Sequence, residues 1–307
     1  MADRIDRHTS GVYIIAATPF TDDGALDLAS LDRLIDFYAE KGVTGLTILG
    51  IMGEADKLTA EERITVLERV LARTSLPVIV GVSDAGIGNL AALALHAMDK
   101  GAAGVMVAPA RGPARDDRVV NYFHAVCDAL GDDVPVCFQD FPQITGVPVS
   151  PRTILELTRD RPQIVMLKHE DCPGLPKITT IRKAEEAGSP RLSILVGNGG
   201  LYLPQELARG VDGAMTGFAY PEALVEIVRL HLGGEADRAE DIFDAYLPIL
   251  RHEQQPVFGL AVRKAILMKR GAIASAATRA PGPRLSATDL VELDRLMART
   301  TDKLKDL

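Results

Sequence analysis

Residues 45–82, GLTILGIMGEADKLTAEERITVLERVLARTSLPVIVGV, contain the unit from which most of the chain is built. The apolar run GLTILG is followed by an amphipathic segment that begins at Thr59, and a second apolar run, PVIVGV, comes after it. Continuous rather than alternating apolar runs indicate strands that are buried on both faces. Glu62 stands three residues after Thr59, which is the pattern of a capping box at a helix start. This stretch therefore predicts a strand, a helix and another strand.

The same alternation continues along the chain. We expect eight strands, in residues 12–20, 45–50, 77–82, 104–109, 135–141, 164–170, 192–198 and 213–218. Helical patterns occupy residues 30–42, 59–73, 116–131, 150–160, 175–188, 204–210 and 221–234. This rhythm predicts an α/β protein with a closed (β/α)8 TIM barrel. A doubly wound open sheet is the alternative, but such a sheet usually has a phosphate-binding fingerprint after its first strand, where this chain has ATPFTDDG.

The last part of the chain has a different pattern. After residue 234 no further strand is expected, and residues 240–254, 257–271 and 286–300 read as three more helices. We therefore divide the chain into a (β/α)8 barrel, residues 1–234, and a C-terminal helical appendage, residues 235–307.

Composition excludes several classes of function. The chain of 307 residues has a net charge of −8 and no run of lysine and arginine, which argues against nucleic acid binding. Three scattered cysteines favour a reducing cytoplasm over a disulfide scaffold. We expect no signal peptide and no membrane span, because the N-terminus is polar and no apolar run approaches about 18 residues. No metal-ligand spacing or nucleotide fingerprint occurs, so neither a metal nor a cofactor is expected.

The segment IVMLKHED, residues 164–171, ends a buried strand on a cation. In a barrel of this kind the chemistry lies at the carboxyl ends of the strands. Side chains alternate along a strand, so Met166, Lys168 and Glu170 should share one face, with His169 on the other. Because the outer face packs against helices, we expect Lys168 to point into the barrel mouth.

A lysine in that position has a natural chemical role. At the usual lysine pKa of about 10.4, only a few molecules in ten thousand are neutral at pH 7, and removal from water lowers the pKa of such a group. The neutral amine can attack a carbonyl carbon and form an imine, which acts as an electron sink. The alternative is that Lys168 only forms an ion pair with Glu170 or Asp171 at the barrel rim.

The chain resembles the dihydrodipicolinate synthase and N-acetylneuraminate lyase family, which are class I, Schiff-base aldolases. The resemblance runs from about Gly11 to Leu296 and implies that Lys168 forms an imine with pyruvate or another 2-oxo acid. It also implies a homotetramer, a dimer of dimers. The motifs that carry it are ATPFTDDGALD, GIMGE (50–54), FPQITG (141–146), IVMLKHED and RKAILMKRG.

Several positions depart from the family pattern. The family usually has Gly-Thr-Thr-Gly-Glu after strand two, and here Ile51 and Met52 replace the two threonines. Backbone N–H groups between Gly50 and Gly53 can still hold a carboxylate, because such a turn needs no side chain for this. Glu54 is expected to brace the turn.

The family's proton relay is also missing. Gln139 stands in place of the catalytic tyrosine and cannot titrate. Arg111 matches the second tyrosine of the synthases, and Ile144 matches the arginine that binds their aldehyde substrate. The chain is therefore expected not to be a true dihydrodipicolinate synthase.

We predict the following division of labour. Lys168 forms the imine, and Gln139 orients the substrate or a water molecule. Arg111 binds a second carboxylate or a phosphate at the far end of the substrate, or is merely a surface arginine. Asn198 is a further candidate for substrate contact. Glu170 and His169 are the possible acid or base, with Asp140 as a weaker candidate and a water held by Gln139 as another.

The leading hypothesis is a Schiff-base lyase or aldolase that acts on pyruvate or a related 2-oxo acid. A sugar-acid dehydratase that uses the same lysine imine is an alternative within the enzymes. A different class of alternative is a non-catalytic relative that only binds a 2-oxo acid, because every titrating group of the relay is replaced.

Overall fold

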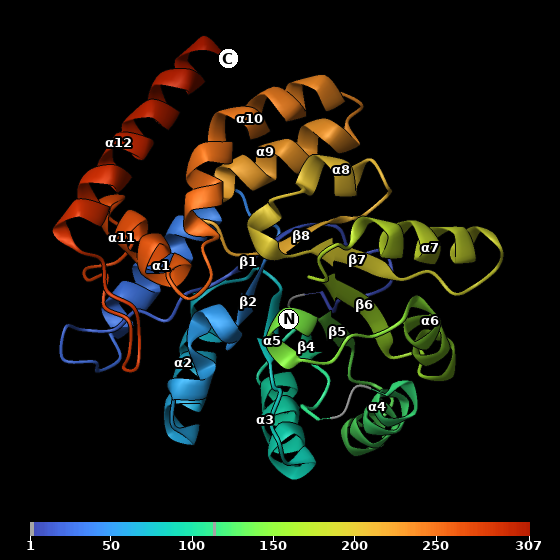
Figure 1. Ribbon diagram of the computed structural model, residues 1–307. Helices are drawn as coiled ribbons and strands as arrows, with labels where there is room; N and C mark the ends of the chain where they lie inside the picture. Colours follow the sequence, from blue (N-terminus) through green and yellow to red (C-terminus); the bar gives the residue numbers. More distant parts are fainter. Residues whose placement is uncertain (1–2, 113–114) are drawn as a thin grey trace.

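The computed structural model describes residues 3–112 and 115–307, and its strands close into a parallel barrel, β1 to β8 in sequence order (Figure 1). Each strand pairs with the next, and β8 closes the ring by pairing with β1. The prediction of a (β/α)8 barrel is confirmed, because each of the eight apolar runs contains a strand. The strands are β1 (Gly11–Ile15), β2 (Gly45–Ile48), β3 (Val78–Gly81), β4 (Gly104–Val107), β5 (Val136–Asp140), β6 (Ile164–His169), β7 (Ser193–Val196) and β8 (Gly213–Thr216).

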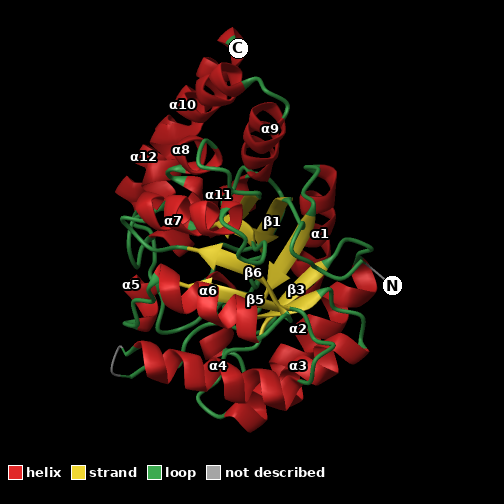
Figure 2. Ribbon diagram, turned by 90° about the vertical axis from the view of Figure 1, so that its right-hand side faces the viewer, coloured by secondary structure: helices red, strands yellow, loops and turns green. Residues whose placement is uncertain are grey.

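Helices surround the strands on the outside (Figure 2). The capping box predicted at Thr59 is present at the start of α2. One helix, α3, lies where the sequence patterns indicated none; it is rich in Ala and Leu all round, so periodicity does not mark it. The helices of the barrel are α1 (Leu28–Glu40), α2 (Ala60–Arg73), α3 (Ile87–Asp99), α4 (Asp116–Leu130), α5 (Pro142–Thr145), α6 (Pro151–Asp160), α7 (Leu175–Glu186), α8 (Leu203–Leu207) and α9 (Pro221–Leu232).

The core has two layers, one inside the barrel and one between strands and helices. Met166 belongs to the small interior cluster, whereas Leu167 belongs to the larger outer cluster. Strand β6 therefore alternates as the sequence predicts, with Met166 and every second residue facing inward. The interior cluster consists of Ile5, Tyr13, Ile15, Ile79, Ala103, Met106, Cys137, Met166, Leu195 and Met215.

Three further helices, α10 (Ala236–Glu253), α11 (Gly259–Lys269) and α12 (Ala287–Lys303), follow the barrel (Figure 1). The buried guanidinium of Arg263 in α11 donates through Nε to Glu253 Oε1 at 2.5 Å and through Nη2 to the Gly217 carbonyl at 2.6 Å. A Cβ atom at Gly217 would lie 1.8 Å from Arg263 Nη1, so this close approach requires glycine. The C-terminal helices are thus fixed to the end of β8. Within the described residues, no helix is long and apolar enough to cross a membrane.

The short helix α8 contains a buried acid, Glu206, whose stability effect should depend on pH. Its side chain is buried, Oε2 has no hydrogen-bond partner among the described residues, and burial raises the pKa of the carboxyl group to about 8. Because the folded state holds this proton more tightly than the unfolded state, the group stabilises at low pH. Its contribution to the free energy of unfolding should fall by about 1.4 kcal/mol per pH unit between roughly pH 5 and 8.

Urea unfolding of Glu206→Gln across this pH range should lack that decline. The matched control is Glu226→Gln, which removes a carboxylate paired with Arg229 on the surface and should change stability by less than about 0.5 kcal/mol at each pH. Parallel pH profiles for wild type and Glu206→Gln would contradict the prediction.

Candidate active site

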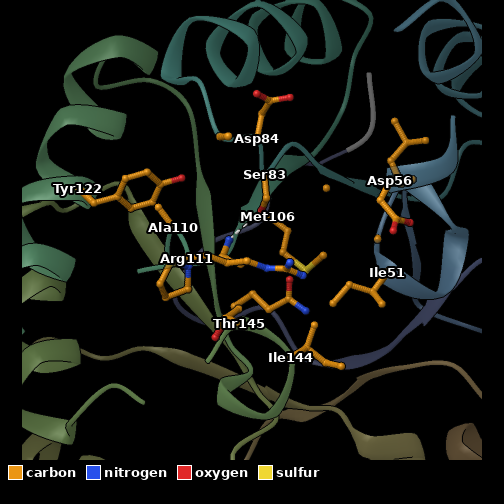
Figure 3. A pocket seen from close by; sticks show the side chains of 18 of the residues that line it. Ile51, Asp56, Ser83, Asp84, Met106, Ala110, Arg111, Tyr122, Ile144 and Thr145 are labelled. Atoms are coloured by element: carbon orange, nitrogen blue, oxygen red, sulfur yellow. Dashed lines mark hydrogen bonds between the residues drawn. The ribbon is translucent and has the colours of Figure 1, made fainter. Parts of the chain in front are cut away.

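A cavity of about 550 Å³ opens at the carboxyl ends of β2 to β5 (Figure 3). This is the end of a (β/α)8 barrel at which active sites are built. Its wall combines apolar side chains, such as Met106 and Ile144, with a few charged groups. The lining residues are Leu49, Gly50, Ile51, Ala55, Asp56, Arg63, Gly81, Ser83, Asp84, Ala85, Met106, Ala108, Pro109, Ala110, Arg111, Tyr122, Gln139, Ile144 and Thr145.

Two polar side chains, those of Lys168 and Gln139, meet at one carboxylate oxygen of Glu170. Lys168 Nζ in β6 lies 2.8 Å from Glu170 Oε2, and Gln139 Nε2 in β5 donates to the same oxygen at 2.8 Å. Gln139 pairs with Lys168 in the register of the two strands, and it lines the cavity. Lys168 and Glu170 are 5% and 6% exposed. The ion pair between Lys168 and Glu170, which was the alternative to a catalytic role, is therefore present. It lies on the inward face of β6 rather than outside the barrel.

The position of Glu170 is fixed by its neighbours. Its backbone N–H donates to the Asp140 carbonyl at 2.9 Å, and its carbonyl accepts from Asn198 Nδ2 at 3.0 Å. A Cβ atom at Gly197 would lie 2.2 Å from Glu170 Cγ, so the side chain packs directly on the Gly197 backbone. Asn198 thus holds the segment that carries Glu170, and in this arrangement it acts on that segment rather than on the cavity.

His169 and Asp140 lie on the other side of the sheet. Asp140 Oδ2 accepts from Lys177 Nζ in α7 at 2.7 Å and lies 3.4 Å from His169 Nδ1. His169 Nε2 is 3.2 Å from the Gly174 carbonyl. Both side chains are completely buried against α7, so neither is placed to exchange a proton with a molecule in the cavity. Strand alternation predicts this outward position, which does not support a role for either side chain as acid or base.

Asp171 also differs from the sequence-based alternative. Its carboxylate pairs with Lys177 at 2.7 Å and not with Lys168. Lys177, a buried cation in α7, was not singled out in the sequence, and no periodic pattern marks it. Its role appears only in the folded chain, where it lies behind β5 and β6 and forms ion pairs with Asp140 and Asp171.

The turn after β2 is a short 3₁₀ helix, η1 (Ile51–Gly53). Gly50 and Ile51 line the cavity, Met52 packs against the interior core, and Gly53 is buried. The N–H of Gly53 donates to the Gly50 carbonyl at 3.0 Å, whereas the first N–H groups of such a helix, those of Ile51 and Met52, have no acceptor within it. Of the four residues proposed to bind a carboxylate, Gly53 uses its backbone donor within the turn, whereas no described residue is found to accept from the N–H of Gly50, Ile51 or Met52.

Glu54 braces this turn from behind. Its buried carboxylate accepts from Lys264 Nζ in α11 at 2.6 Å and from Lys57 Nζ at 2.9 Å. The backbone N–H of Arg279 donates to the same carboxylate at 2.9 Å. The C-terminal helices are therefore part of the support of the cavity wall. The sequence motif RKAILMKRG contains Lys264, but nothing in its pattern indicates a buried cation.

Arg111 lies in the segment after β4, and Figure 3 shows its side chain extending into the cavity alongside Met106. Residues 113 and 114 lie outside the described residues; among residues 3–112 and 115–307, no hydrogen bond or ion pair engages the Arg111 guanidinium. Nearby arginines are different: Arg115 pairs with Asp117 at 2.9 Å, and Arg63, which also lines the cavity, pairs with Asp84 at 3.8 Å.

Arg63, Asp84 and Tyr122 line the cavity without having been predicted to do so. Asp84 stands shortly after β3, so the rule that chemistry follows strand ends would have found it. Arg63 and Tyr122 come from helices α2 and α4, and no comparable rule identifies them.

Comparison with known proteins places the chain among a group of related enzymes. The sequence model of the dihydrodipicolinate synthetase family matches residues 8–299. The chain is 31% identical over 302 residues to L-2-keto-3-deoxyarabonate dehydratase from Azospirillum brasilense, covering 96% of this chain and 95% of the relative. It is 30% identical over 244 residues to 4-hydroxy-tetrahydrodipicolinate synthase from Methanothrix thermoacetophila, covering 78% and 80% of the two chains.

A solved structure, a dihydrodipicolinate synthase from Rhodopseudomonas palustris, superimposes with a TM-score of 0.95 at 47% identity. The match covers 97% of this chain and all of that one. These similar proteins belong to one family, but their names include both a dehydratase and synthases. The names therefore do not agree on the reaction.

The packing of Glu170 on Gly197 generates a prediction. Gly197→Ala should push Glu170 away from Lys168, because the new Cβ would lie 2.2 Å from Cγ and 2.6 Å from Oε1. A crystal structure should show Lys168 Nζ and Glu170 Oε2 no longer within hydrogen-bond distance, and the variant should lose about 1–3 kcal/mol of stability.

Gly50→Ala is the matched control for this substitution. Its Cβ would meet Met106 Cε at 3.6 Å and Ile15 Cγ2 at 3.7 Å, which are ordinary contacts, so the ion pair should stay in place. An unchanged Lys168–Glu170 contact in Gly197→Ala would show that the glycine is not what positions the carboxylate.

Proposed function

The chain belongs to the dihydrodipicolinate synthetase family, and we propose that within it the chain is a Schiff-base-forming lyase acting on pyruvate or a related 2-oxo acid. Members of this family are lyases or dehydratases of the class I aldolase type. The observation that carries the proposal is the position of Lys168 Nζ, which is buried at the barrel mouth 2.8 Å from a carboxylate. An amine nucleophile and a proton acceptor are thereby in hydrogen-bond contact.

Imine formation needs only these two groups. Lys168 passes one ammonium proton to Glu170 Oε2, and the neutral amine attacks C2 of the 2-oxo acid. The second nitrogen proton moves to the former carbonyl oxygen and gives a carbinolamine. Glu170 then returns its proton to this hydroxyl, which leaves as water, and the C2=N bond forms as an iminium ion. The step consumes one ammonium and one ketone and releases one water.

The iminium then accepts the electrons of the bond that breaks. In a lyase reaction, Glu170 takes the proton of the hydroxyl on C4, the C3–C4 bond breaks, and an aldehyde leaves while C3 becomes part of an enamine. Glu170 returns the proton to C3. Water then adds to the iminium and releases pyruvate and Lys168.

The other candidate residues bind and orient. Gln139 donates to Glu170 Oε2 at 2.8 Å, so it holds the carboxylate in one orientation without exchanging a proton itself. The N–H groups of Ile51 and Met52 bind the carboxylate of the 2-oxo acid, and Gly50 and Gly53 shape that turn. Asn198 positions the Glu170 segment, and Arg111 meets the far end of the substrate.

A second candidate is a dehydratase that uses the same imine. It is favoured by the carboxylate beside Lys168 and by the 31% identical relative named as a dehydratase. Glu170 would remove a proton from C3, the hydroxyl on C4 would leave as water by taking that proton, and no carbon–carbon bond would break. A true dihydrodipicolinate synthase is not proposed, because Gln139, Arg111 and Ile144 replace its tyrosines and arginine.

Reductive trapping tests the shared step. Incubation with pyruvate and borohydride should add a reduced pyruvyl group to Lys168, detected by peptide mass spectrometry, and Lys168→Ala should take up none. Glu170→Gln should still be trapped but more slowly, and its turnover should fall by about 10²–10⁴-fold.

Product analysis on candidate 2-oxo acids then separates the reactions, because a lyase releases pyruvate and an aldehyde whereas a dehydratase releases water and one dehydrated acid with its carbon chain intact. Absence of any adduct with pyruvate and with longer 2-oxo acids would overturn the proposal. Binding of a 2-oxo acid that survives Lys168→Ala, without turnover, would instead support a non-catalytic relative.

We further propose that the protein is a cytoplasmic homotetramer, a dimer of dimers, as its family resemblance implies. Light scattering on the purified protein should then give a mass of about 132 kDa, four times the 32.9 kDa of one chain. A mass near 33 kDa at micromolar concentration would contradict this.

A further inference from the structure

We infer that Arg111 makes the enzyme selective for 2-oxo acids that carry a second carboxylate at the end remote from the imine. The inference rests on the proposed function, because it assumes that Lys168 captures the 2-oxo group. It adds a substrate class, the dicarboxylic 2-oxo acids, and assigns the discrimination to one side chain.

Arg111 is directed into the cavity, and no described residue provides a counterion for it. Its side chain extends into the cavity alongside Met106 (Figure 3), and none of the described residues forms an ion pair with it. Arg63, the other cationic residue of the cavity wall, is already engaged: Nη1 lies 3.8 Å from Asp84 Oδ2, and Nε donates to the Ala55 carbonyl at 3.0 Å. Arg111 is therefore the cation that is available to a bound anion.

The cavity is large, and its wall is mostly apolar around Arg111. A volume of about 550 Å³ is far more than a three-carbon acid fills, so a longer molecule is expected to occupy it. The apolar side chains of Ile51, Met106 and Ile144 line the space in which Arg111 lies. Arg111 itself is exposed, so this apolar lining reduces the screening of its ion pair by water only in part.

The guanidinium of Arg111 and the acidic residues near it favour a carboxylate over a phosphate as the bound group. The planar guanidinium matches a carboxylate with two parallel hydrogen bonds. A phosphate dianion would find only this one uncommitted guanidinium, and it would also meet the acidic residues Asp56 and Asp84 on the same cavity wall. Asp84 is held by Arg63 and by the N–H of Gly86, whereas Asp56 is exposed. An ionised Asp56 only accepts hydrogen bonds, which suits hydroxyl groups along the chain of the substrate.

The test compares two 2-oxo acids of equal length, 2-oxohexanedioate and 2-oxohexanoate, which differ only in the terminal carboxylate. The second-order rate of borohydride trapping at Lys168 is measured for each. In wild type the dicarboxylate should be trapped about ten- to a hundredfold more efficiently, which is the range expected for a hydrogen bond to a charged group. In Arg111→Met the ratio should fall towards one, and Arg111→Lys should be intermediate because it keeps the charge and loses the fork.

Arg115→Met is the matched control, because it removes an arginine from the same loop that is paired with Asp117 outside the cavity. Its ratio should equal that of wild type. A ratio near one in wild type, or an unchanged ratio in Arg111→Met, would overturn the inference while trapping by pyruvate leaves the proposed function standing. Faster trapping of a 2-oxo acid with a terminal phosphonate would overturn the choice of carboxylate. If no 2-oxo acid is trapped at all, the proposed function fails and the inference fails with it.

Discussion

The contact between Lys168 Nζ and Glu170 Oε2, 2.8 Å long and almost completely buried, is the constraint on which the rest of the site depends. Taking an ammonium and a carboxylate out of water costs several kcal/mol for each ion, and the pair recovers this only with good geometry and further hydrogen bonds. Gln139 supplies one such bond, to the same oxygen. If either charged partner were removed, the other would remain buried without compensation. The arrangement is therefore maintained only while the ends of β5, β6 and β7 keep their relative positions.

Those strand ends are held from the outer side of the sheet. Asp140 follows Gln139 in β5 and His169 follows Lys168 in β6, and both outward side chains pack against α7, where Lys177 joins Asp140 to Asp171. Alternation thus gives β5 and β6 each one residue that faces the barrel interior, Gln139 or Lys168, and one that anchors the strand from outside. The turn after β2 is anchored by a different device, the buried pair of Glu54 with Lys264 in α11. Because these anchors lie in α7 and α11, the geometry of the mouth depends on helices that do not line it.

The sequence predicts those parts of the molecule in which residue types repeat at the spacing of a strand or a helix. The eight apolar runs and the inward direction of Lys168 follow from strand periodicity, and the capping box at Thr59 follows from spacing. Helix α3 was not predicted, because an Ala- and Leu-rich helix has no polar stripe that would reveal a helical period. The sequence does not identify Lys177 and Lys264 for another reason: Asp140 and Glu54, which they bind, lie 37 and 210 residues away, and only tertiary packing brings each pair together. Parity alone separates Glu170 from His169: Glu170 contacts Lys168, whereas His169 lies on the outer side of the sheet, and the role of Glu170 as acid or base stays a proposal.

A single carboxylate beside the imine restricts the reactions that the proposed function can include. In the proposed mechanism Glu170 must accept and return every proton, because Gln139, Ile51 and Met52 offer no titrating group. One group is sufficient when the two protonation sites lie close together in one substrate, as C3 and the C4 hydroxyl oxygen do in cleavage at C3–C4 or in loss of the C4 hydroxyl. A condensation of two molecules requires in addition that the second molecule be bound and activated. As proposed, Gly50 and Ile51 of the anion-binding turn line the same cavity as the Arg111 guanidinium, which no described residue engages, and a single longer substrate would be held at both points. Under the proposed function, this geometry favours cleavage or elimination over synthesis.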